Sequence, residues 1–314
     1  MSALVNDIII LKLGGSVITA KSKPQTLNVR AIKNIAKIIS EFDKPIIVVH
    51  GAGSFGHYFA KRFRISNKQT TSTKAIIQIR ESMIKLNSSV IEIFNKYKIN
   101  TLSFSPISMY NKKNILLHWE DYLKKMLNMD MVPITYGDMI LGSKGFYIIS
   151  GDVIVKDLTR MLNPRNVVFA SDIDGIYSDI NDKSTLIKKV QLNKRYSINF
   201  NTQKFDVTGG IQTKLKQALD IAQLGTNVQI TNGLRPRMLM KALKLKENPM
   251  GIKETIERAV NAGFNTYPTN VTGNPSLTVP CGIGENNLPI GIQFIARHFN
   301  ESLLFRIGSR FEEA

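Results

Sequence analysis

The sequence contains few of the residues that disulfide-bonded, metal-binding and membrane proteins require. Its single cysteine, Cys281, excludes a disulfide framework and a cysteine-based zinc site. Of its four histidines, His118 and His298 have no companions at metal-ligand spacing, and no metal ligand is predicted. No apolar run approaches the roughly 18 to 20 residues needed to span a membrane. Asp7 precedes the apolar residues 8–11, which favours a first core strand over a signal peptide. We therefore expect a soluble, cytoplasmic protein with no membrane partner.

Acidic residues are also scarce. The 314 residues include 42 Lys and Arg but only 24 Asp and Glu, a net charge of +18. Residues 253–314 have a net charge of −1, which leaves +19 on residues 1–252. The lysines are scattered and no nucleic-acid-binding signature appears, so a nucleic-acid partner is not expected. Small anionic substrates account for the charge equally well.

Two glycine-rich turns each follow a short apolar run. Residues 8–12 lead into Gly14-Gly15-Ser16, and residues 45–49 lead into the segment His50 to His57. Glycine lets consecutive backbone N–H groups converge on one anion, and a helix that starts just after adds its positive end. Two such turns predict a nucleotide polyphosphate in one and an anionic acceptor in the other, which indicates a phosphotransferase.

The second turn also fits a different pattern. Gly51, Gly53 and Gly56 have the spacing of the dinucleotide-binding fingerprint. That fingerprint requires an acidic residue about twenty positions later, whereas residues 68–74 are basic and polar. Dinucleotide binding is the weaker alternative.

The order of elements predicts an α/β fold. Apolar runs and helical periodicities alternate along residues 1–252. This alternation predicts a three-layer αβα sandwich around a largely parallel central sheet, with ligand loops at the carboxyl ends of the strands. We expect strands at 8–12, 45–49, 131–135, 146–149, 167–170 and 227–231, and helices at 29–42, 74–98 and 214–224.

A boundary is predicted near Ile252. Residues 253–314 differ in charge and carry several proline and asparagine turns. We expect a small C-terminal α/β fragment there, with strands at 276–281 and 289–296 and a helix at 301–311.

Phosphoryl transfer requires alignment of donor and acceptor and neutralisation of negative charge. Lys12 and Lys21 lie beside the first glycine turn, and Lys214 follows another glycine pair. Asp152 could orient lysine ammonium groups or simply cap a loop. His57 could donate a hydrogen bond to an acceptor phosphate, whereas His50 at a strand end is interpreted as structural.

Residues 1–252 resemble the amino acid kinase superfamily and, within it, the isopentenyl phosphate kinases. The histidine of Gly-Ser-Phe-Gly-His carries the narrower resemblance. The matching strings are Lys12 to Thr19 with Lys21, His50 to His57, Tyr136-Gly137-Asp138, Ile149 to Asp152, Asp172 to Tyr177, and Asp206 to Gly210 with Lys214.

The resemblance implies an ATP-dependent kinase that converts isopentenyl phosphate to isopentenyl diphosphate in isoprenoid biosynthesis, by the archaeal-type mevalonate route. It further implies a homodimer and Mg²⁺ held mainly by phosphate oxygens and water. The implied catalytic residues are Lys12, His57, Asp152 and Lys214. The implied ATP-binding residues are Lys12, Gly14, Gly15, Ser16, Lys21, Asp172, Asp174, Gly175, Tyr177, Gly209 and Lys214. The implied acceptor-binding residues are Gly51, Ala52, Gly53, His57, Ser150 and Gly151.

Two positions depart from the family pattern, and two rival functions follow from the sequence. Ala20 precedes the second lysine where an acidic or polar residue is usual, and the last family strand is replaced by Gly251-Ile252-Lys253. A phosphonate kinase of the fosfomycin type would share the histidine turn. The other rival is a catalytically weak fusion whose tail docks on an amidotransferase partner.

The tail, residues 253–314, resembles the C-terminal end of the amidase-signature family, to which an amidotransferase component acting on glutamyl-tRNA belongs. The similarity covers 270–282, 288–293 and 297–299. The glycine- and serine-rich loop that carries that family's nucleophile does not occur in the sequence, so no amidase activity is expected.

Overall fold

The computed structural model describes residues 7–20, 23–65, 69–111, 114–115, 118–177, 182–187, 210–244, 275–283, 289–297 and 300–312. The chain divides into two compact units, Met1–Pro249 and Met250–Ala314. The first contains the site described below.

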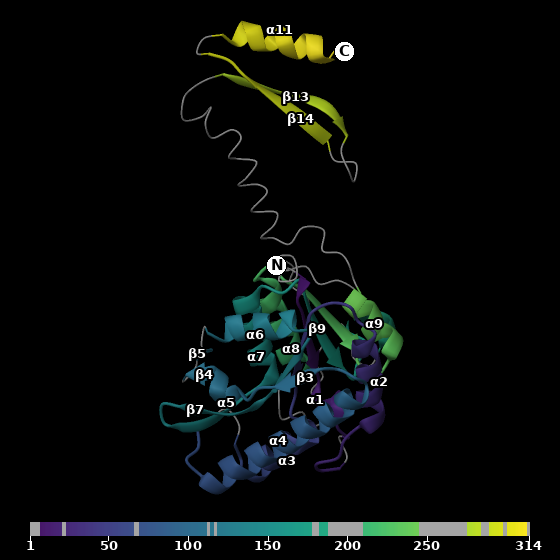
Figure 1. The fold of residues 1–314 in the computed structure, drawn as a ribbon, viewed down its shortest axis with the longest axis vertical. Helices are drawn as coiled ribbons and strands as arrows, with labels where there is room; N and C mark the ends of the chain where they lie inside the picture. Colours follow the sequence, from purple (N-terminus) through teal and green to yellow (C-terminus); the bar gives the residue numbers. More distant parts are fainter. Residues whose placement is uncertain are drawn as a thin grey trace. The chain divides into compact units, whose positions relative to one another are not determined.

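The centre of the first unit is a six-stranded sheet in which every neighbouring pair is parallel (Figure 1). The strand order is β12-β9-β1-β2-β6-β3, so the first strand of the chain lies in the middle of the sheet. The strands are β1 (Ile9–Leu13), β2 (Ile46–His50), β3 (Thr101–Ser103), β6 (Val132–Tyr136), β9 (Asn166–Ser171) and β12 (Asn227–Asn232).

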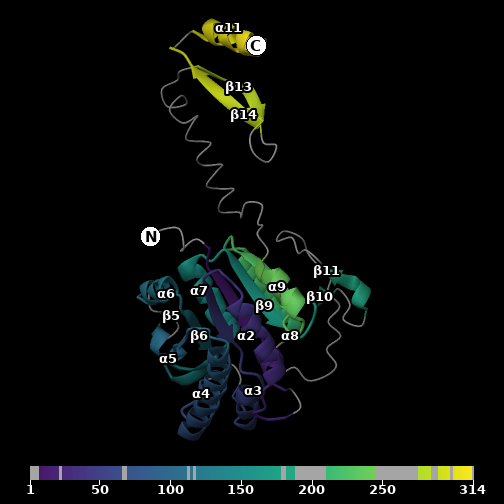
Figure 2. The same ribbon diagram turned by 45° about the vertical axis from the view of Figure 1, so that its right-hand side comes forward.

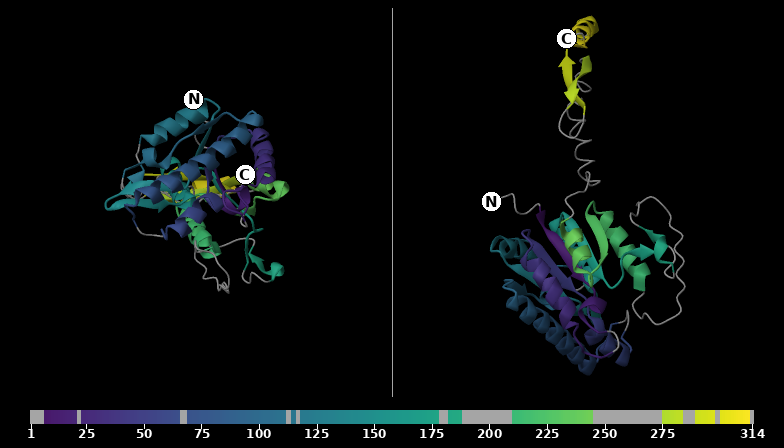
Figure 3. Two further views of the ribbon diagram at one scale, coloured as in Figure 1. Left: turned by 90° about the horizontal axis from the view of Figure 1, so that it is seen from below. Right: turned by 90° about the vertical axis from the view of Figure 1, so that its right-hand side faces the viewer.

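Helices cover both faces of this sheet (Figures 2 and 3). Alternate residues of β1 point to opposite faces: Leu11 packs in one apolar core and Ile10 in the other. The first core includes residues of α1 (Gly15–Ile18), α2 (Val29–Ser40), α3 (Gly53–Arg62), α4 (Thr73–Lys96) and α9 (Pro236–Lys244). The second includes residues of α5 (Pro106–Met109), α6 (Trp119–Asn128), α7 (Gly151–Leu162) and α8 (Gly210–Ala222).

This arrangement confirms the predicted αβα sandwich with a parallel sheet. The predicted strand at 146–149 is real, but it belongs to an antiparallel hairpin of β7 (Asp138–Gly142) and β8 (Gly145–Ile149) outside the central sheet. Two further two-stranded pieces are seen among the described residues of the first unit. One pairs β4 (Tyr110–Asn111) with β5 (Asn114–Ile115). The other pairs β10 (Ile176–Tyr177) with β11 (Leu186–Ile187), and the short helix η2 (Lys183–Thr185) directly precedes β11. The altered last strand at 251–253 lies outside the described residues.

The second unit contains the two predicted strands and the predicted helix. β13 (Ser276–Ile283) and β14 (Pro289–Ile295) pair antiparallel, and α11 (Glu301–Glu312) packs on β13. A Cβ on Gly308 would lie 2.5 Å from Leu277 Cδ2, so the absence of a side chain allows this close approach. Among all the described helices, none combines the length and the apolar character needed to cross a membrane.

Candidate active site

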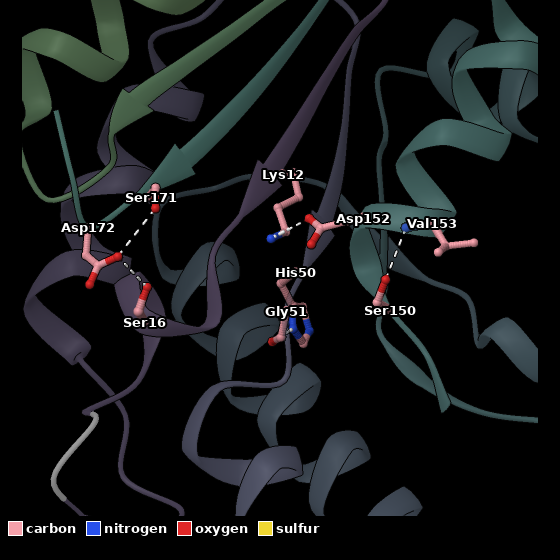
Figure 4. Close-up of polar contacts among 9 residues, drawn as sticks. All are labelled: Lys12, Ser16, His50, Gly51, Ser150, Asp152, Val153, Ser171 and Asp172. Atoms are coloured by element: carbon pink, nitrogen blue, oxygen red, sulfur yellow. Dashed lines mark hydrogen bonds and ion pairs between the residues drawn. The ribbon is translucent and has the colours of Figure 1, made fainter. Parts of the chain in front are cut away.

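The chemically distinctive residues gather where the parallel strands end. Lys12 lies near the end of β1, His50 ends β2, and Asp172 follows β9 (Figure 4). Because parallel strands end at the same edge, loops far apart in the sequence meet there.

Lys12 and Asp152 form an ion pair at this edge. Lys12 Nζ lies 2.6 Å from Asp152 Oδ1, and the two side chains are 7% and 17% exposed. Asp152 is in the first turn of α7, where a negative charge is favoured by the helix dipole. The ammonium also lies 6.0 Å from the centre of the Phe169 ring. A cation so little exposed needs such a partner, and the pairing fixes one positive charge at the centre of the site.

The first glycine turn is anchored on β9. Gly14 donates its N–H to the Ala170 carbonyl at 2.8 Å, and a Cβ on Gly14 would lie 2.9 Å from the same oxygen. The Ser16 hydroxyl donates to Asp172 Oδ1 at 2.9 Å, as does the Ser171 hydroxyl at 3.3 Å. Two residues implied to bind ATP, Ser16 and Asp172, therefore contact one another (Figure 4).

The second glycine turn touches the first through its backbone. Gly51 donates its N–H to the Leu13 carbonyl at 2.8 Å, and a Cβ on Gly51 would lie 2.9 Å from Gly15 N. A Cβ on Gly15 would overlap the backbone of Gly53. Gly53 has a φ of +48°, a conformation that glycine adopts without strain. The two predicted anion cradles thus lie side by side.

The start of α7 borders the second turn. Ser150 caps this helix: its hydroxyl oxygen accepts a hydrogen bond from the Val153 N–H at 3.2 Å. A Cβ on Gly151 would lie 3.1 Å from the His50 carbonyl oxygen. A positive helix end and the Asp152 carboxylate are therefore placed next to the predicted acceptor turn.

His50 is a buried structural residue. Its Nδ1 lies 3.1 Å from the Gly51 carbonyl oxygen, its Nε2 lies 3.2 Å from Asn87 Oδ1, and its ring stacks on Tyr136 with centroids 5.3 Å apart. Burial lowers the pKa of His50 to about 4, against the opposing effect of these two acceptors. The ring is therefore neutral near pH 7, and it contacts the second turn at the Gly51 carbonyl.

A second buried ion pair supports the segment after β6. Arg80 on α4 lies 3.0 Å from Asp138 Oδ2 and donates to the Met139 carbonyl at 3.0 Å. Burial raises the pKa of Asp138 to about 6, although Arg80 acts to lower it. The intervening Gly137 packs against α7: a Cβ there would lie 3.1 Å from Gly151 N. The pair joins residues 58 positions apart, and no local sequence signal predicts it.

The remaining residues implied by the resemblance are distributed around this edge. His57 is exposed on α3, one turn after Gly53. Asp174 accepts from Asn232 Nδ2 at 2.8 Å and pairs with Arg235 at 3.2 Å. Gly175 and Tyr177 lie at β10, and Ala52 precedes α3. Lys21 and Gly209 lie outside the described residues, as does the side chain of Lys214 on α8.

No group of three or more His, Cys, Asp or Glu side chains is placed to hold a metal ion within the described part of the chain. The carboxylates at the site are instead engaged with Lys12, Ser16 and Asn232.

Comparison with known proteins defines the class. A model of the amino acid kinase family matches residues 7–232, and the chain belongs to this family. It is 33% identical to the isopentenyl phosphate kinase of Thermoplasma acidophilum over 240 residues, which are 74% of this chain and 94% of that one. The crystal structure of an isopentenyl phosphate kinase substrate complex matches with a TM-score of 0.64 and 27% identity, over 78% of this chain and 98% of the other. Within the family, the chain is an isopentenyl phosphate kinase homologue and an enzyme of the kinase class.

The tail matches a different family. A model of the amidase family covers residues 234–305. Over 49 residues the chain is 47% identical to a component of the glutamyl-tRNA(Gln) amidotransferase of Bacillus thuringiensis. These are 16% of this chain but only 10% of that protein. The expected resemblance of the tail to an amidase fragment is confirmed.

Proposed function

We propose that this kinase transfers the γ-phosphoryl group of ATP to isopentenyl phosphate and produces isopentenyl diphosphate and ADP. A phosphate oxygen of the acceptor attacks the γ-phosphorus, and the bond from that phosphorus to the bridging oxygen of ADP breaks. The observation that carries the proposal is the backbone contact between two glycine turns, with the Lys12 ammonium beside them.

ATP is assigned to the first turn. α1 begins at Gly15, just after β1, so the N–H groups of Gly15 and Ser16 belong to its first turn, where backbone donors suit phosphate oxygens. Lys21, Gly209 and Lys214 are assigned to the same nucleotide because the resemblance implies it. Asp172, Asp174, Gly175 and Tyr177, which follow β9, are assigned to the nucleoside.

The acceptor phosphate is assigned to the second turn. Gly51, Ala52 and Gly53 let the backbone approach the phosphate closely. The N-terminus of α7 at Ser150 and Gly151 adds backbone N–H donors and the positive end of the helix dipole. His57 is proposed to donate a hydrogen bond to this phosphate. No general base is required, because a phosphate monoester oxygen is already nucleophilic at neutral pH.

Lys12 is proposed to stabilise the charge on the moving phosphoryl group. Its ammonium is held by Asp152 before substrate binds, so little reorganisation is needed as charge develops. Lys214 is assigned to the same phosphoryl group because the resemblance implies it. Asp152 acts through Lys12, whose ammonium group it holds in place.

Mg²⁺ is proposed to enter with ATP, held by phosphate oxygens and water. The donor set fits this assignment because the Asp152 carboxylate is already paired with Lys12. When bound, the ion neutralises charge on the nucleotide phosphates. We further assign the enzyme to isoprenoid biosynthesis in the cytoplasm, as a homodimer. Light scattering tests the last point, with an expected mass about twice the 35.2 kDa of one chain.

The test is a panel of acceptors. Release of ADP is measured with isopentenyl phosphate, fosfomycin and UMP at equal concentrations, with Mg²⁺ and ATP. We expect kcat/KM to be highest for isopentenyl phosphate and turnover to be lost in Lys12→Ala. A preference for fosfomycin would instead support the phosphonate kinase, and turnover with none of the three would refute the proposal.

A further inference from the structure

Thr19 occupies the contact between the two glycine turns. It is the C-cap residue that follows α1 and is only 2% exposed. The Thr19 hydroxyl donates to the Gly15 carbonyl at 2.7 Å and accepts from the Ser54 N–H at 2.9 Å. One side chain thus connects the first turn to the second.

The packing around this hydroxyl leaves little freedom. A Cβ on Gly53 would overlap the Thr19 side chain and lie 2.7 Å from the Gly15 carbonyl oxygen. The Thr19 backbone is itself fixed, because its N–H bonds to the Gly15 carbonyl at 3.0 Å and the residue forms an isolated β-bridge with Leu27. Thr19 therefore determines where the start of α3 lies relative to the first turn.

We propose that Thr19 is a positioning residue that sets the distance between the ATP phosphates and the acceptor phosphate. This inference rests on the proposed function, since it assigns one substrate to each turn. Each turn keeps its own ligand contacts whether or not the hydroxyl is present. What the hydroxyl fixes is their relative placement, and misplacement by about 1 Å can lower a rate about 100-fold.

Substitutions of Thr19 can distinguish this positioning role from simple packing. Valine has nearly the shape of threonine but makes neither hydrogen bond, which leaves the part-buried Gly15 carbonyl and Ser54 N–H without this partner. Serine keeps the hydroxyl and loses only a methyl group. Thr159 provides a matched control: it is 1% exposed, and its hydroxyl donates to the Val155 carbonyl at 2.8 Å within α7, away from both turns.

The experiment compares steady-state kinetics of the full-length wild type, Thr19→Val, Thr19→Ser and Thr159→Val with ATP and isopentenyl phosphate. We expect Thr19→Val to lower kcat roughly 10- to 100-fold, with KM for both substrates within about threefold. Thr19→Ser should stay within about threefold of wild type, and Thr159→Val should have the wild-type kcat. If Thr19→Val does not fold, Thr19→Ala takes its place.

Amide hydrogen exchange at Ser54 provides a readout that does not depend on activity. The Ser54 amide should exchange faster in Thr19→Val than in the wild type, with no such change in Thr159→Val. A normal kcat in Thr19→Val, an equal loss in Thr159→Val, or unchanged exchange at Ser54 would overturn the inference. If the wild type does not phosphorylate isopentenyl phosphate, the proposed function fails, and exchange at Ser54 still decides whether Thr19 couples the turns.

Discussion

His50 should make the stability of the kinase unit depend on pH. Burial lowers the pKa of His50 from 6.5 to about 4, so the unfolded chain binds a proton between these pH values and the folded chain does not. The stabilising contribution is therefore complete above about pH 6.5 and is lost as the pH falls toward 4. The difference of about 2.5 pH units corresponds to ~3 kcal/mol at about 1.4 kcal/mol per unit.

Asp138 acts in the opposite direction over the same range. Burial raises the pKa of Asp138 from 3.8 to about 6, so the folded chain holds a proton that the unfolded chain has released. The stabilising contribution of the protonated Asp138 therefore falls by ~3 kcal/mol as the pH rises from about 4 to 6. The two effects largely cancel in the wild type, and only a difference between wild type and variant reveals either one.

The assay is urea unfolding from pH 4 to 8, followed by fluorescence. The chain has one tryptophan, Trp119 on α6, so the signal reports the kinase unit alone. The free energy of unfolding of the wild type minus that of His50→Gln should be ~3 kcal/mol smaller at pH 4 than at pH 7. The corresponding difference for Asp138→Asn should change with the opposite sign. Parallel curves for wild type and His50→Gln would refute the reasoning.

Three further predictions concern catalysis. Lys12→Ala should lower kcat at least about 100-fold, because it removes a preorganised positive charge; a normal kcat with only a raised KM for ATP would show that Lys12 merely binds nucleotide. His57→Ala should lower kcat/KM for isopentenyl phosphate roughly 10- to 150-fold with KM for ATP nearly unchanged, as expected for one hydrogen bond to a charged phosphate; near-normal turnover would count against this role. A chain that ends at Lys253 should keep activity within a few-fold and aggregate no more than the full chain; loss of activity in a folded protein would mean that the tail completes the kinase.

β1 and β2 could be predicted because each is a mostly apolar run that leads into a glycine turn. Residues 8–12 and 45–49 lie within one residue of the observed β1 and β2. The partner of a strand was harder to predict. The residues of β8 have strand character, but the hairpin with β7 depends on a turn and not on the composition of the strand. β3 has three residues, too few for any periodicity.

The site could be predicted only in part. The glycine turns and Lys12 have local signatures, since position beside a strand end is visible in the sequence. The contacts that assemble them are not: Ser16 meets Asp172 over 156 residues, and Thr19 meets Ser54 over 35. Thr19 belongs to the string that carried the resemblance, yet its role follows only from the packing of one turn on the other.

Phosphorus NMR of the reaction mixture tests the central claim most directly. Full-length enzyme is incubated with Mg²⁺, ATP and isopentenyl phosphate, and Lys12→Ala serves as the control. We predict that the monophosphate resonance of the acceptor is replaced by two mutually coupled resonances of a diphosphate, with one ADP formed for each, and that the control shows neither. Formation of inorganic phosphate and ADP with the acceptor unchanged would contradict the account.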